Sequence, residues 1–438
     1  MSEERPSSIE REPSCEDVVE PALLPVIEAR RRIAARLVPL AERETLALAD
    51  AAARVLAEDV NAPFDVPARA NSAMDGYAID RVSIPATGEA TLTLVGTAWA
   101  GRPFAGRLAA GQAVRIFTGG VMPDGADTVV IQEHVAADEA SVRIDADVTP
   151  GRNVRAAGED VAAGQRVFAA GHRLGAAELG VLASLGIGRV TVLRRVRVAC
   201  FTTGDELRSL ATDTDGAPPP DGCLYDSNRY TLAALLAGLG VETIDLGIVP
   251  DEPAATRQAL REGARRADLV VTSGGISAGD ADFVTRAFHE VGDVAFWKIA
   301  MRPGRPLAFG FIGKDDDAAP GAAFFGLPGN PVAVMVTFLQ FVQPAIRRLS
   351  GRPDREPLVL PARSLSTLRK SPGRVEYQRG VMRVEEGELV VASTGKQGAG
   401  RLSSMSAANC LIVIDTDVDG VAPGDRVGVQ PFEGLMPG

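Results

Sequence analysis

Hydrophobic and polar positions divide the chain into stretches of different periodicity. From residue 194 to about 350, apolar runs of strand length alternate with longer segments of helical periodicity. The clearest run is Leu269–Thr272, whose apolar and β-branched residues lie between polar flanks, a pattern typical of a strand buried on both faces. Strands that alternate with helices in this way form parallel sheets. The sequence therefore predicts a doubly wound, mostly parallel α/β domain over residues 194–351.

The segments on either side of this domain lack the alternation. Short β-type runs between 79 and 150 predict a small β domain over residues 63–155, and similar runs predict a β-barrel-like domain over residues 352–438. Such modules flank the α/β domain on both sides, so we expect a multidomain protein.

The remaining segments are helical or polar. Helical patterns cover 21–59 and 171–189, so we expect residues 21–62 and 156–193 to join as one discontinuous helical and β domain. Residues 1–20 are rich in Glu, Ser, Pro and Arg and are expected to form a disordered tail. The Pro-, Asp- and Gly-rich segment 208–224 is expected to be a mobile loop.

Composition narrows the classes of function. The chain has 438 residues, which suggests about three domains. Its net charge of -11 gives no general affinity for nucleic acid or for an anionic membrane. Four cysteines without a C-x-x-C pair and only three histidines disfavour a zinc site or a disulfide framework. Neither a signal-type h-region nor a long apolar run occurs, so we expect a cytoplasmic protein.

The strand at 269–272 ends in a glycine turn, Ser273-Gly274-Gly275, and carboxylates follow at Asp280 and Asp282. Glycine permits positive φ and lets backbone N–H groups approach a ligand. A turn of this kind before a helix binds anions. The neighbouring carboxylates would repel an anion, so a cation such as Mg²⁺ is expected between them. For this turn alone, a tight connection without function is the alternative.

Other segments reinforce this interpretation. Asp205 and Glu206 follow one strand, and the Pro328–Pro331 turn, with Asn330, follows another. In a parallel sheet these turns share the edge at which ligands bind. Lys298, Arg302 and Arg305 add a basic cluster, which favours an anionic ligand, although a solvated cationic loop is the alternative.

Several common catalytic motifs are missing from the sequence. No P-loop, no G-x-S-x-G elbow and no G-x-G-x-x-G after the first strand occurs. Carboxylates, glycine turns and basic side chains remain, an inventory that suits metal-assisted transfer at a phosphate or a similar oxyanion.

Ordered motifs resemble one enzyme family. T-G-D-E-L, S-G-G-I-S-A-G-D-A-D, K-I-A-M-R-P-G-R-P and G-L-P-G-N-P are similar, in this order, to motifs of the MoeA family of molybdopterin molybdenumtransferases, which resembles the E domain of gephyrin. N-S-A-M-D-G-Y-A, I-F-T-G-G and R-A-A-G-E-D match upstream, and S-T-G-K-Q-G-A-G-R-L-S-S-M-S matches downstream. The resemblance covers nearly all of the chain after the first 20 or so residues.

The resemblance implies a function and an assembly. Molybdate would be inserted into the dithiolene of molybdopterin, with adenylyl-molybdopterin as the substrate, AMP as a product and Mg²⁺ as the cofactor. An elongated homodimer is implied, with the discontinuous domain in dimerisation and the site between subunits. Molybdopterin adenylyltransferase and other enzymes of molybdenum-cofactor synthesis are compatible partners.

The resemblance also implies roles for individual residues. The expected catalytic residues are Asp75, Thr118, Glu206, Asp251 and Asp282, of which Glu206, Asp251 and Asp282 would bind the metal ion. Arg374 and Ser404 match positions linked to molybdate, and Arg302 and Arg305 stand where many relatives have Lys. The expected substrate-binding residues are Arg155, Asp160, Ser273, Gly274, Gly275, Ser277, Lys298, Arg302, Arg305, Pro328, Gly329, Asn330, Pro331, Arg374 and Ser404.

Two other functions are alternatives at this point. Molybdopterin adenylyltransferase has a catalytic domain that resembles residues 194–350, but it usually lacks flanking β modules. A non-catalytic scaffold like gephyrin is the second alternative, although a scaffold need not keep Glu206 or Asp282. Tungstate in place of molybdate is a third alternative, within the same reaction.

Overall fold

The computed structural model describes residues 23–210, 216–275, 288, 290–313, 321–353 and 355–432. The chain forms two compact units, of which one is Arg43–Leu193 and the other combines Met1–Glu42 with Arg194–Gly438. The chain therefore passes between the units twice, after Glu42 and after Leu193.

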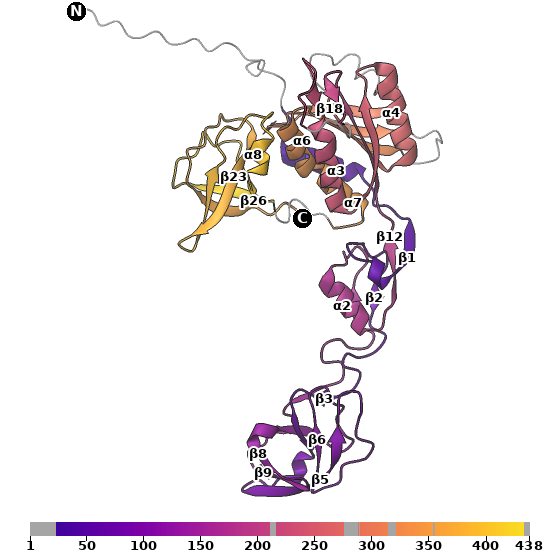
Figure 1. Cartoon of the computed structure of the whole chain (residues 1–438), viewed down its shortest axis with the longest axis vertical. Helices are drawn as coiled ribbons and strands as arrows, with labels where there is room; N and C mark the ends of the chain where they lie inside the picture. The colour runs from indigo at the N-terminus through magenta and orange to yellow at the C-terminus, as the bar shows by residue number, and fades with distance from the viewer. Residues whose placement is uncertain are drawn as a thin grey trace, which may run out of the picture. The chain divides into compact units, whose positions relative to one another are not determined.

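The larger unit contains a six-stranded sheet of order β16-β13-β17-β21-β20-β18 (Figure 1). The first four strands are parallel to one another. β20 is antiparallel to both of its neighbours, so β18 again runs in the direction of the parallel strands. The predicted, mostly parallel sheet is confirmed. The strands are β13 (Arg197–Thr203), β16 (Glu242–Val249), β17 (Leu269–Ser273), β18 (Gly292–Lys298), β20 (Pro306–Ile312) and β21 (Ala322–Leu327).

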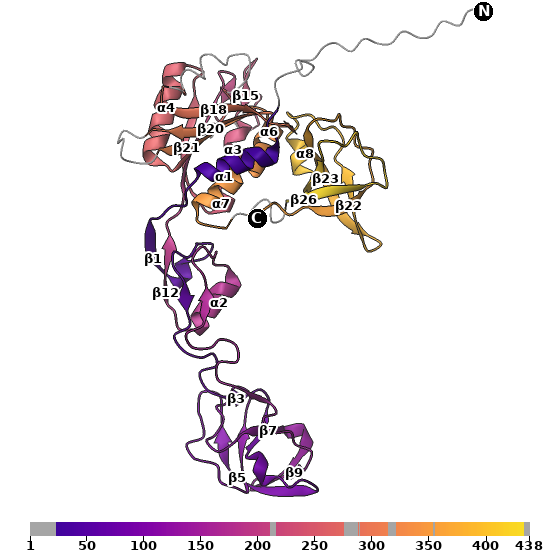
Figure 2. The ribbon, with the colours of Figure 1, turned by 180° about the vertical axis from the view of Figure 1, so that it is seen from behind.

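Helices cover both faces of this sheet (Figures 1 and 2). Alternate residues of β13 point to opposite faces: Val198 lies in the hydrophobic cluster with α3, and Ala199 lies in the cluster with α4. Figure 2 shows α1 lying along α7 on the α3 side. The helices are α1 (Val26–Arg36), α3 (Ser227–Leu239), α4 (Pro253–Arg266), α6 (Pro331–Thr337), η4 (Phe338–Val342) and α7 (Gln343–Leu349).

α6, η4 and α7 form one continuous helix, Pro331–Leu349. Among the described residues it is the one helix that is long and apolar enough to cross a membrane by length and composition alone. Its 18-residue apolar window is 78% buried inside the protein. Val334, Phe338 and Ile346 lie in the hydrophobic core on one face of the sheet, so this helix serves as the core helix of the α/β domain.

The helical pattern predicted over residues 21–59 is wrong beyond α1. Residues Arg43–Ala47 form β1, which pairs antiparallel with β12 (Arg189–Leu193), and only Leu48–Asp50 forms a short helical turn, η1. Ala53 has a positive φ of 63°, which no α-helix accommodates. Tertiary strand pairing has overridden the helix propensity of the alanine-rich segment.

This pairing also bears on the discontinuous domain predicted from residues 21–62 and 156–193. The structure divides the first segment at Glu42, because α1 packs on the core of the α/β domain whereas β1 pairs with β12. The β1–β12 pair packs near α2 (Ala176–Ser184) around the buried residues Leu56, Leu182 and Val192.

The rest of the Arg43–Leu193 unit is a six-stranded sheet of order β7-β4-β6-β5-β9-β8. Two further strand pairs, β2–β11 and β3–β10, connect this sheet to the α2 region of the same unit. The strands are β2 (Val60–Asn61), β3 (Asn71–Ser72), β4 (Gly76–Ile79), β5 (Glu89–Ala98), β6 (Gln112–Ile116), β7 (Thr128–Ile131), β8 (Val135–Ala137), β9 (Ser141–Asp145), β10 (Val154–Arg155) and β11 (Arg166–Phe168), with short turns η2 (Arg81–Ser83) and η3 (Gln132–His134).

The C-terminal segment forms a closed barrel. Its strand order is β23-β24-β22-β26-β25, and β25 pairs back with β23, which closes the ring. β19 (Met301–Arg302) pairs with the start of β23 and so joins the basic segment to the barrel. The remaining elements are β22 (Leu360–Ser364), β23 (Val375–Glu385), β24 (Glu388–Ser393), α8 (Ser403–Ser406), β25 (Cys410–Ile414) and β26 (Arg426–Pro431).

The segment 208–224, predicted to be a mobile loop, is closed at its ends by β14 (Leu207–Arg208) and β15 (Leu224–Tyr225), which pair in parallel. Residues 211–215 within it lie outside the described residues.

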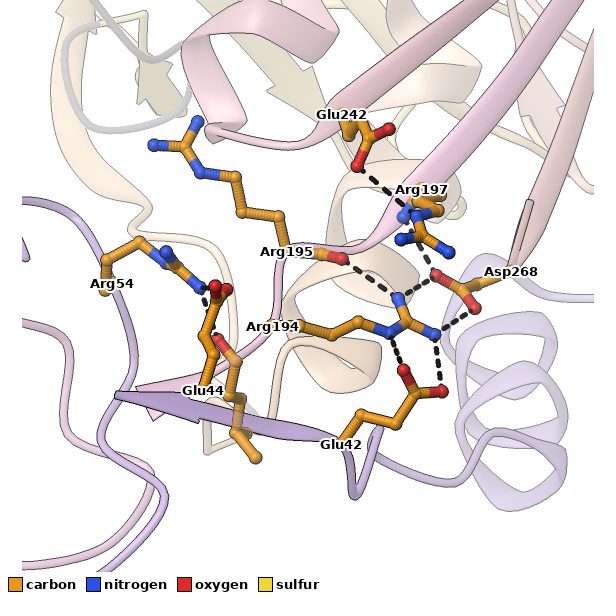
Figure 3. Close-up of polar contacts among 9 residues, drawn as sticks. Glu42, Glu44, Arg54, Arg194, Arg195, Arg197, Glu242 and Asp268 are labelled. Atoms are coloured by element: carbon orange, nitrogen blue, oxygen red, sulfur yellow. Dashed lines mark hydrogen bonds and ion pairs between the residues drawn. The ribbon is translucent and has the colours of Figure 1, made fainter. Parts of the chain in front are cut away.

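A buried ion pair lies in the larger unit where the chain enters and leaves it (Figure 3). The Arg194 guanidinium donates to both carboxylate oxygens of Asp268, at 2.7 and 2.8 Å, and also to Glu42. The side chains of Arg194 and Asp268 are only 14% and 11% exposed. These hydrogen bonds raise the pKa of Arg194. Arg194 thus ties Glu42 to the edge of the α/β sheet.

Candidate functional site

A cavity of about 480 Å³ lies between the α/β domain and the barrel, within the larger unit. β13, β17 and β21 end at this cavity, and β20 begins there. The directions of the strands bring these ends to one edge of the sheet, as the sequence predicts. The barrel contributes Arg374, Glu376, Tyr377, Arg379 and Gln397–Ala399 to its wall.

The glycine turn after β17 forms a close-fitting part of the cavity wall. Gly274 has a φ of 93°, and a Cβ added there would lie 2.4 Å from the carbonyl oxygen of Thr203. A Cβ added at Gly275 would lie 2.9 Å from the Thr203 hydroxyl oxygen. A Cβ at Gly329 would lie 3.9 Å from the Gly274 Cα, so the turns after β17 and β21 are neighbours. Only glycine lets the backbone at residues 274 and 275 approach Thr203 so closely.

The structure brings most of the predicted turn residues together. The residues of the three turns that line the cavity are Thr203, Gly204, Glu206, Leu207, Ser273, Gly274, Gly275, Pro328, Gly329 and Asn330. Pro331 is the first residue of α6, directly after Asn330. Ser277, Asp280 and Asp282 lie outside the described residues.

Two of the expected metal ligands, Glu206 and Asp251, line the cavity. The backbone N–H of Asp251 donates to Asp205 Oδ1 at 3.2 Å, which ties the loop after β16 to the loop after β13. Among the described residues, no group of three or more His, Cys, Asp or Glu side chains is placed to hold a metal ion. The carboxylates among the described lining residues are Glu206, Asp251 and Glu376, of which the first two are the expected ligands.

Arginines line the opposite wall. Arg302 and Arg305 lie in a tight turn at Gly304, where φ is 99° and a Cβ would lie 2.4 Å from Thr337 Cγ2. Arg374 reaches the same cavity from the residue before β23. Lys298, at the end of β18, is exposed at the same edge of the sheet but does not line the cavity.

The sequence interpretation missed Arg379, which also lines the cavity. Arg379 is 1% exposed, and its guanidinium donates to Ser404 Oγ at 3.0 Å and to the Gly398 carbonyl at 3.2 Å. Burial lowers the pKa of Arg379 to about 10, which still leaves it protonated at neutral pH. The available signal was strand periodicity, because residues two positions apart in a strand point to the same face. Arg379 therefore points to the same side of β23 as the buried Tyr377.

Ser404, expected to bind substrate, lies directly behind the Arg379 guanidinium. It lies on α8, is 8% exposed, and is not among the residues that line the cavity. Its hydroxyl donates to the Arg401 carbonyl at 2.6 Å and accepts from Arg379 Nε. Ser404 therefore orients the guanidinium of Arg379.

Asn228 is the second residue that the sequence interpretation missed. It lies in the first turn of α3 and lines the cavity. The N-cap of this helix is Asp226, whose carboxylate accepts from the Arg229 N–H at 3.1 Å and from Thr202 Oγ1. A capping Asp followed by a polar residue in the first turn, near a ligand-binding edge, was the available signal.

The other expected site residues belong to the Arg43–Leu193 unit. Asp75 Oδ1 accepts from both the backbone N–H and the hydroxyl of Thr118, each at 2.8 Å. These two bonds, followed by the charge of Arg115, lower the pKa of Asp75. Arg155 is exposed in β10, opposite Asn71, and Asp160 is exposed in the following loop.

Comparisons with known proteins agree with this architecture. Residues 24–186 match the MoeA N-terminal region (domain I and II), residues 199–348 match a probable molybdopterin binding domain, and residues 361–432 match the MoeA C-terminal region (domain IV). A molybdopterin molybdenumtransferase of Haemophilus influenzae is 39% identical over 94% of this chain and 100% of its own length. The chain belongs to the MoeA family.

Other members of the MoeA family extend the comparison. A molybdopterin molybdenumtransferase of a Nostoc species is 37% identical over 85% of each chain. The crystal structure of a molybdopterin biosynthesis MoeA protein from Pyrococcus horikoshii has a TM-score of 0.79 and 27% identity, and it covers 93% of this chain and 100% of that chain. The resemblance and the fold class predicted from the sequence are thus confirmed.

Proposed function

We propose that this protein is a molybdopterin molybdenumtransferase that inserts molybdate into adenylylated molybdopterin and releases AMP. The names of its full-length relatives support the transferase activity. The observation that carries the proposal is the buried guanidinium of Arg379 in a cavity that also contains glycine turns and the carboxylates of Glu206 and Asp251.

Arg379 favours an oxyanion in the cavity. A buried charge is costly unless it is paired. Its hydrogen bonds go to a hydroxyl and a carbonyl, and within the described residues no carboxylate forms a salt bridge with it. The charge of Glu376, in the same wall, favours the protonated guanidinium without bonding to it directly. A dianion such as molybdate would supply a directly bound counter-charge through charge-assisted hydrogen bonds. Arg374, on the same wall, would add to the positive field.

The other side of the cavity favours a phosphorylated ligand. Gly274 and Gly275 line the cavity in a glycine turn after a strand, and a turn of this kind suits a phosphate group. Arg302 and Arg305 face the same space and offer planar forks of N–H donors, which bind phosphate oxygens in pairs. A pyrophosphate linkage between a pterin and AMP is the kind of ligand that both features suit.

The carboxylates fit a magnesium ion. Mg²⁺ binds oxygen ligands, and proteins usually hold it by one or two carboxylates together with substrate phosphates. Glu206 and Asp251 would be those ligands, and Asp282 is a further candidate from the sequence. When bound, the ion would neutralise charge on the pyrophosphate.

The atoms of the proposed reaction balance. Two thiol sulfurs of molybdopterin replace two oxygens of molybdate, which leave as two water molecules with the two thiol protons and two protons from solvent. Hydrolysis of the pyrophosphate linkage consumes one water and releases AMP. The residues of this chain would hold the two anions side by side and offset their mutual repulsion.

We also propose that the protein is a cytoplasmic homodimer, in which other enzymes of molybdenum-cofactor synthesis are compatible partners. Asp75 and Thr118 would then complete the site, and Arg155 and Asp160 would contact substrate. The MoeA N-terminal match, which includes all four residues, supports this part of the proposal.

An insertion assay tests the proposed function. Purified protein would be given adenylyl-molybdopterin, molybdate and Mg²⁺, and AMP release and molybdenum bound to the pterin would be measured. We expect Arg379→Met to lower both at least about 100-fold. Arg379→Lys, which keeps the charge, would lose less. Arg383→Met is the matched control, because Arg383 lies on the same strand in an exposed pair with Glu385.

Two outcomes would change the proposal, and one further measurement would define the oxyanion preference. Consumption of ATP with free molybdopterin would indicate the adenylyltransferase. Absence of AMP release and of molybdenum insertion from the wild-type protein, with all substrates supplied, would favour a scaffold. Replacing molybdate with tungstate in the same assay would measure the preference between the two oxyanions.

A further inference from the structure

Asn228 is fixed in one orientation by two hydrogen bonds. Its Nδ2 donates to the Gly329 carbonyl at 2.7 Å and to Ser273 Oγ at 2.9 Å. A carbonyl can only accept, so the amide nitrogen must face Gly329. The proton of Ser273 Oγ is already donated to the Pro328 carbonyl at 3.1 Å, so Ser273 must accept from Asn228 as well. Both contacts exclude the flipped amide.

This orientation leaves Asn228 Oδ1 with no partner. Asn228 is 8% exposed, and its Oδ1 is buried without a hydrogen bond within the described structure. The hydroxyl of Thr203, in the same cavity, is also buried without a partner. A buried acceptor that is left unsatisfied destabilises the protein. Asn228 lines the cavity, so a ligand bound there lies next to its side chain.

The chemistry of Oδ1 decides which part of a ligand it can bind. An amide oxygen only accepts, and the oxygens of molybdate and of an ionised phosphodiester only accept too. Oδ1 therefore cannot serve the anions for which the arginines are suited. It requires an N–H or O–H group.

We propose that Asn228 Oδ1 accepts a hydrogen bond from an N–H or O–H group of the pterin nucleotide and so determines substrate specificity. The donor chemistry has three sources: the amino-pyrimidinone edge of the pterin, the 6-amino group of adenine and the ribose hydroxyls of AMP. This inference rests on the proposed function for the identity of the ligand. A site that hydrogen-bonds a substrate group rejects the analogue that lacks it, because its own polar atom is then left unpaired.

Binding measurements on ligand pairs test this inference without turnover. Calorimetry on the full-length protein would compare three pairs of ligands: AMP with 2′,3′-dideoxy-AMP, AMP with purine riboside 5′-monophosphate, which lacks the adenine amino group, and pterin with lumazine, whose 2-oxo group replaces the amino donor. We expect the wild-type protein to bind one parent compound about tenfold more tightly than its donor-less analogue. Asn228→Ala should bind the two members of that pair equally.

Two further variants separate this role from a structural one. Ser273→Ala removes a partner of the Asn228 amide but keeps Oδ1, so the preference for the parent compound should remain. Asn228→Asp keeps an acceptor oxygen at Oδ1 but sets a second acceptor against the Gly329 carbonyl, so it should lower the melting temperature whether or not Oδ1 binds ligand, which thermal denaturation would show. Where Asn228→Ala does not fold, the preference of the wild-type protein and of Ser273→Ala still tests the inference.

The inference is overturned if the wild-type protein binds each parent compound and its donor-less analogue equally, or if Asn228→Ala keeps the preference of the wild type, because Oδ1 would then make no hydrogen bond to the ligand. Loss of AMP release in the insertion assay with the binding preference intact would instead count against the proposed function alone.

Discussion

Asp75 and Thr118 form a contact in which a single substitution has a measurable effect. The ionised carboxylate accepts two hydrogen bonds from Thr118, which favour the charged form and lower its pKa below the ordinary value of 3.8. The depressed pKa contributes stability that is present above pH 3.8 and is lost as the pH falls through the lowered pKa. The carboxylate is therefore ionised throughout the neutral range.

We expect Thr118→Val to raise the pKa of Asp75 towards its ordinary value, because the hydroxyl donor is removed. The backbone N–H of residue 118 and the charge of Arg115 remain, so the pKa should stay below 3.8. Carboxyl carbon shifts in an NMR titration would measure the change. Thr91→Val, at an exposed position in β5, is the control, and an unchanged Asp75 titration in Thr118→Val would contradict the prediction.

Single residues also show where sequence interpretation succeeds. Gly274 and Glu206 could be assigned to a ligand-binding edge because a glycine turn after a buried strand is a local pattern. Arg379 could not, since its burial depends on closure of the barrel between β25 and β23, residues far apart in sequence. The orphaned Oδ1 of Asn228 likewise depends on carbonyls at residues 328 and 329, about 100 positions away.

At the scale of secondary structure, the turn after β17 makes a second prediction. We expect Gly274→Ala to destabilise the protein by at least about 1–3 kcal/mol and to abolish AMP binding, because alanine is strained at a φ of 93° and its Cβ would overlap the Thr203 carbonyl. Chemical denaturation and calorimetry would measure these effects.

A glycine elsewhere provides the matched control. Gly180 lies inside α2, and a Cβ added there would have nothing within 4 Å. Gly180→Ala should therefore stabilise the protein by about 0.5–1 kcal/mol, since alanine has the higher helix propensity. If Gly274→Ala and Gly180→Ala changed the free energy of unfolding in the same direction, the close approach of Gly274 to Thr203 would not explain the effect at Gly274.

The ion pair of Arg194 tests the contribution of a buried charge between elements. We expect Arg194→Met to destabilise the larger unit by about 3–5 kcal/mol, because it leaves Asp268 with fewer partners in a buried position. Glu42→Gln should cost no more than about 1 kcal/mol, since the Glu42 side chain is 68% exposed. Denaturant unfolding would measure the free energy of unfolding of both variants. Equal destabilisation would contradict the larger role given to the buried Arg194–Asp268 pair, which Figure 3 shows.

Elements differ in how well local sequence predicts them. The strands of the α/β domain contain short apolar or β-branched runs, and each was identifiable by itself. β1 was not, because Arg43–Ala47 continues an alanine-rich, helix-type pattern and becomes a strand only by pairing with Arg189–Leu193. The nearly 150 residues between these partners leave no local trace of the pairing.

At the scale of the whole molecule, chain direction explains why the site could be located. Five of the six strands of the α/β sheet run in one direction, since β20 alone is antiparallel to its neighbours. The ends of β13, β17 and β21 therefore meet at one edge, and the start of β20 brings the Arg302–Arg305 turn to it. The barrel wall, which the sequence could not orient, completes the cavity through the pairing of β19 with β23.

The proposed homodimer leads to a last prediction. Asp75 belongs to the Arg43–Leu193 unit, and Glu206 belongs to the other unit. If a complete site combines Asp75 of one subunit with Glu206 of the other, then Asp75→Asn and Glu206→Gln should each abolish activity in a homodimer, whereas a mixed dimer of the two variants would contain one intact site.

Random association makes half of the dimers mixed, and each mixed dimer has one intact site of two, so co-expression should restore about a quarter of wild-type AMP release. The matched mixture is the doubly substituted chain with the wild type at equal amounts. In that mixture each site of a mixed dimer contains one substituted residue, so both of its sites are inactive. Only the wild-type homodimers, a quarter of all dimers, release AMP, so this mixture also keeps about a quarter of wild-type activity. Because the two mixtures give the same activity, the mixed dimers must be purified and compared. Two different affinity tags, one on each chain, would isolate them. The purified Asp75→Asn and Glu206→Gln pair should reach half of wild-type activity, whereas the purified pair of wild-type and doubly substituted chains should be inactive. If Asp75 and Glu206 act within one chain, the two results exchange places, because only the wild-type subunit then keeps an intact site.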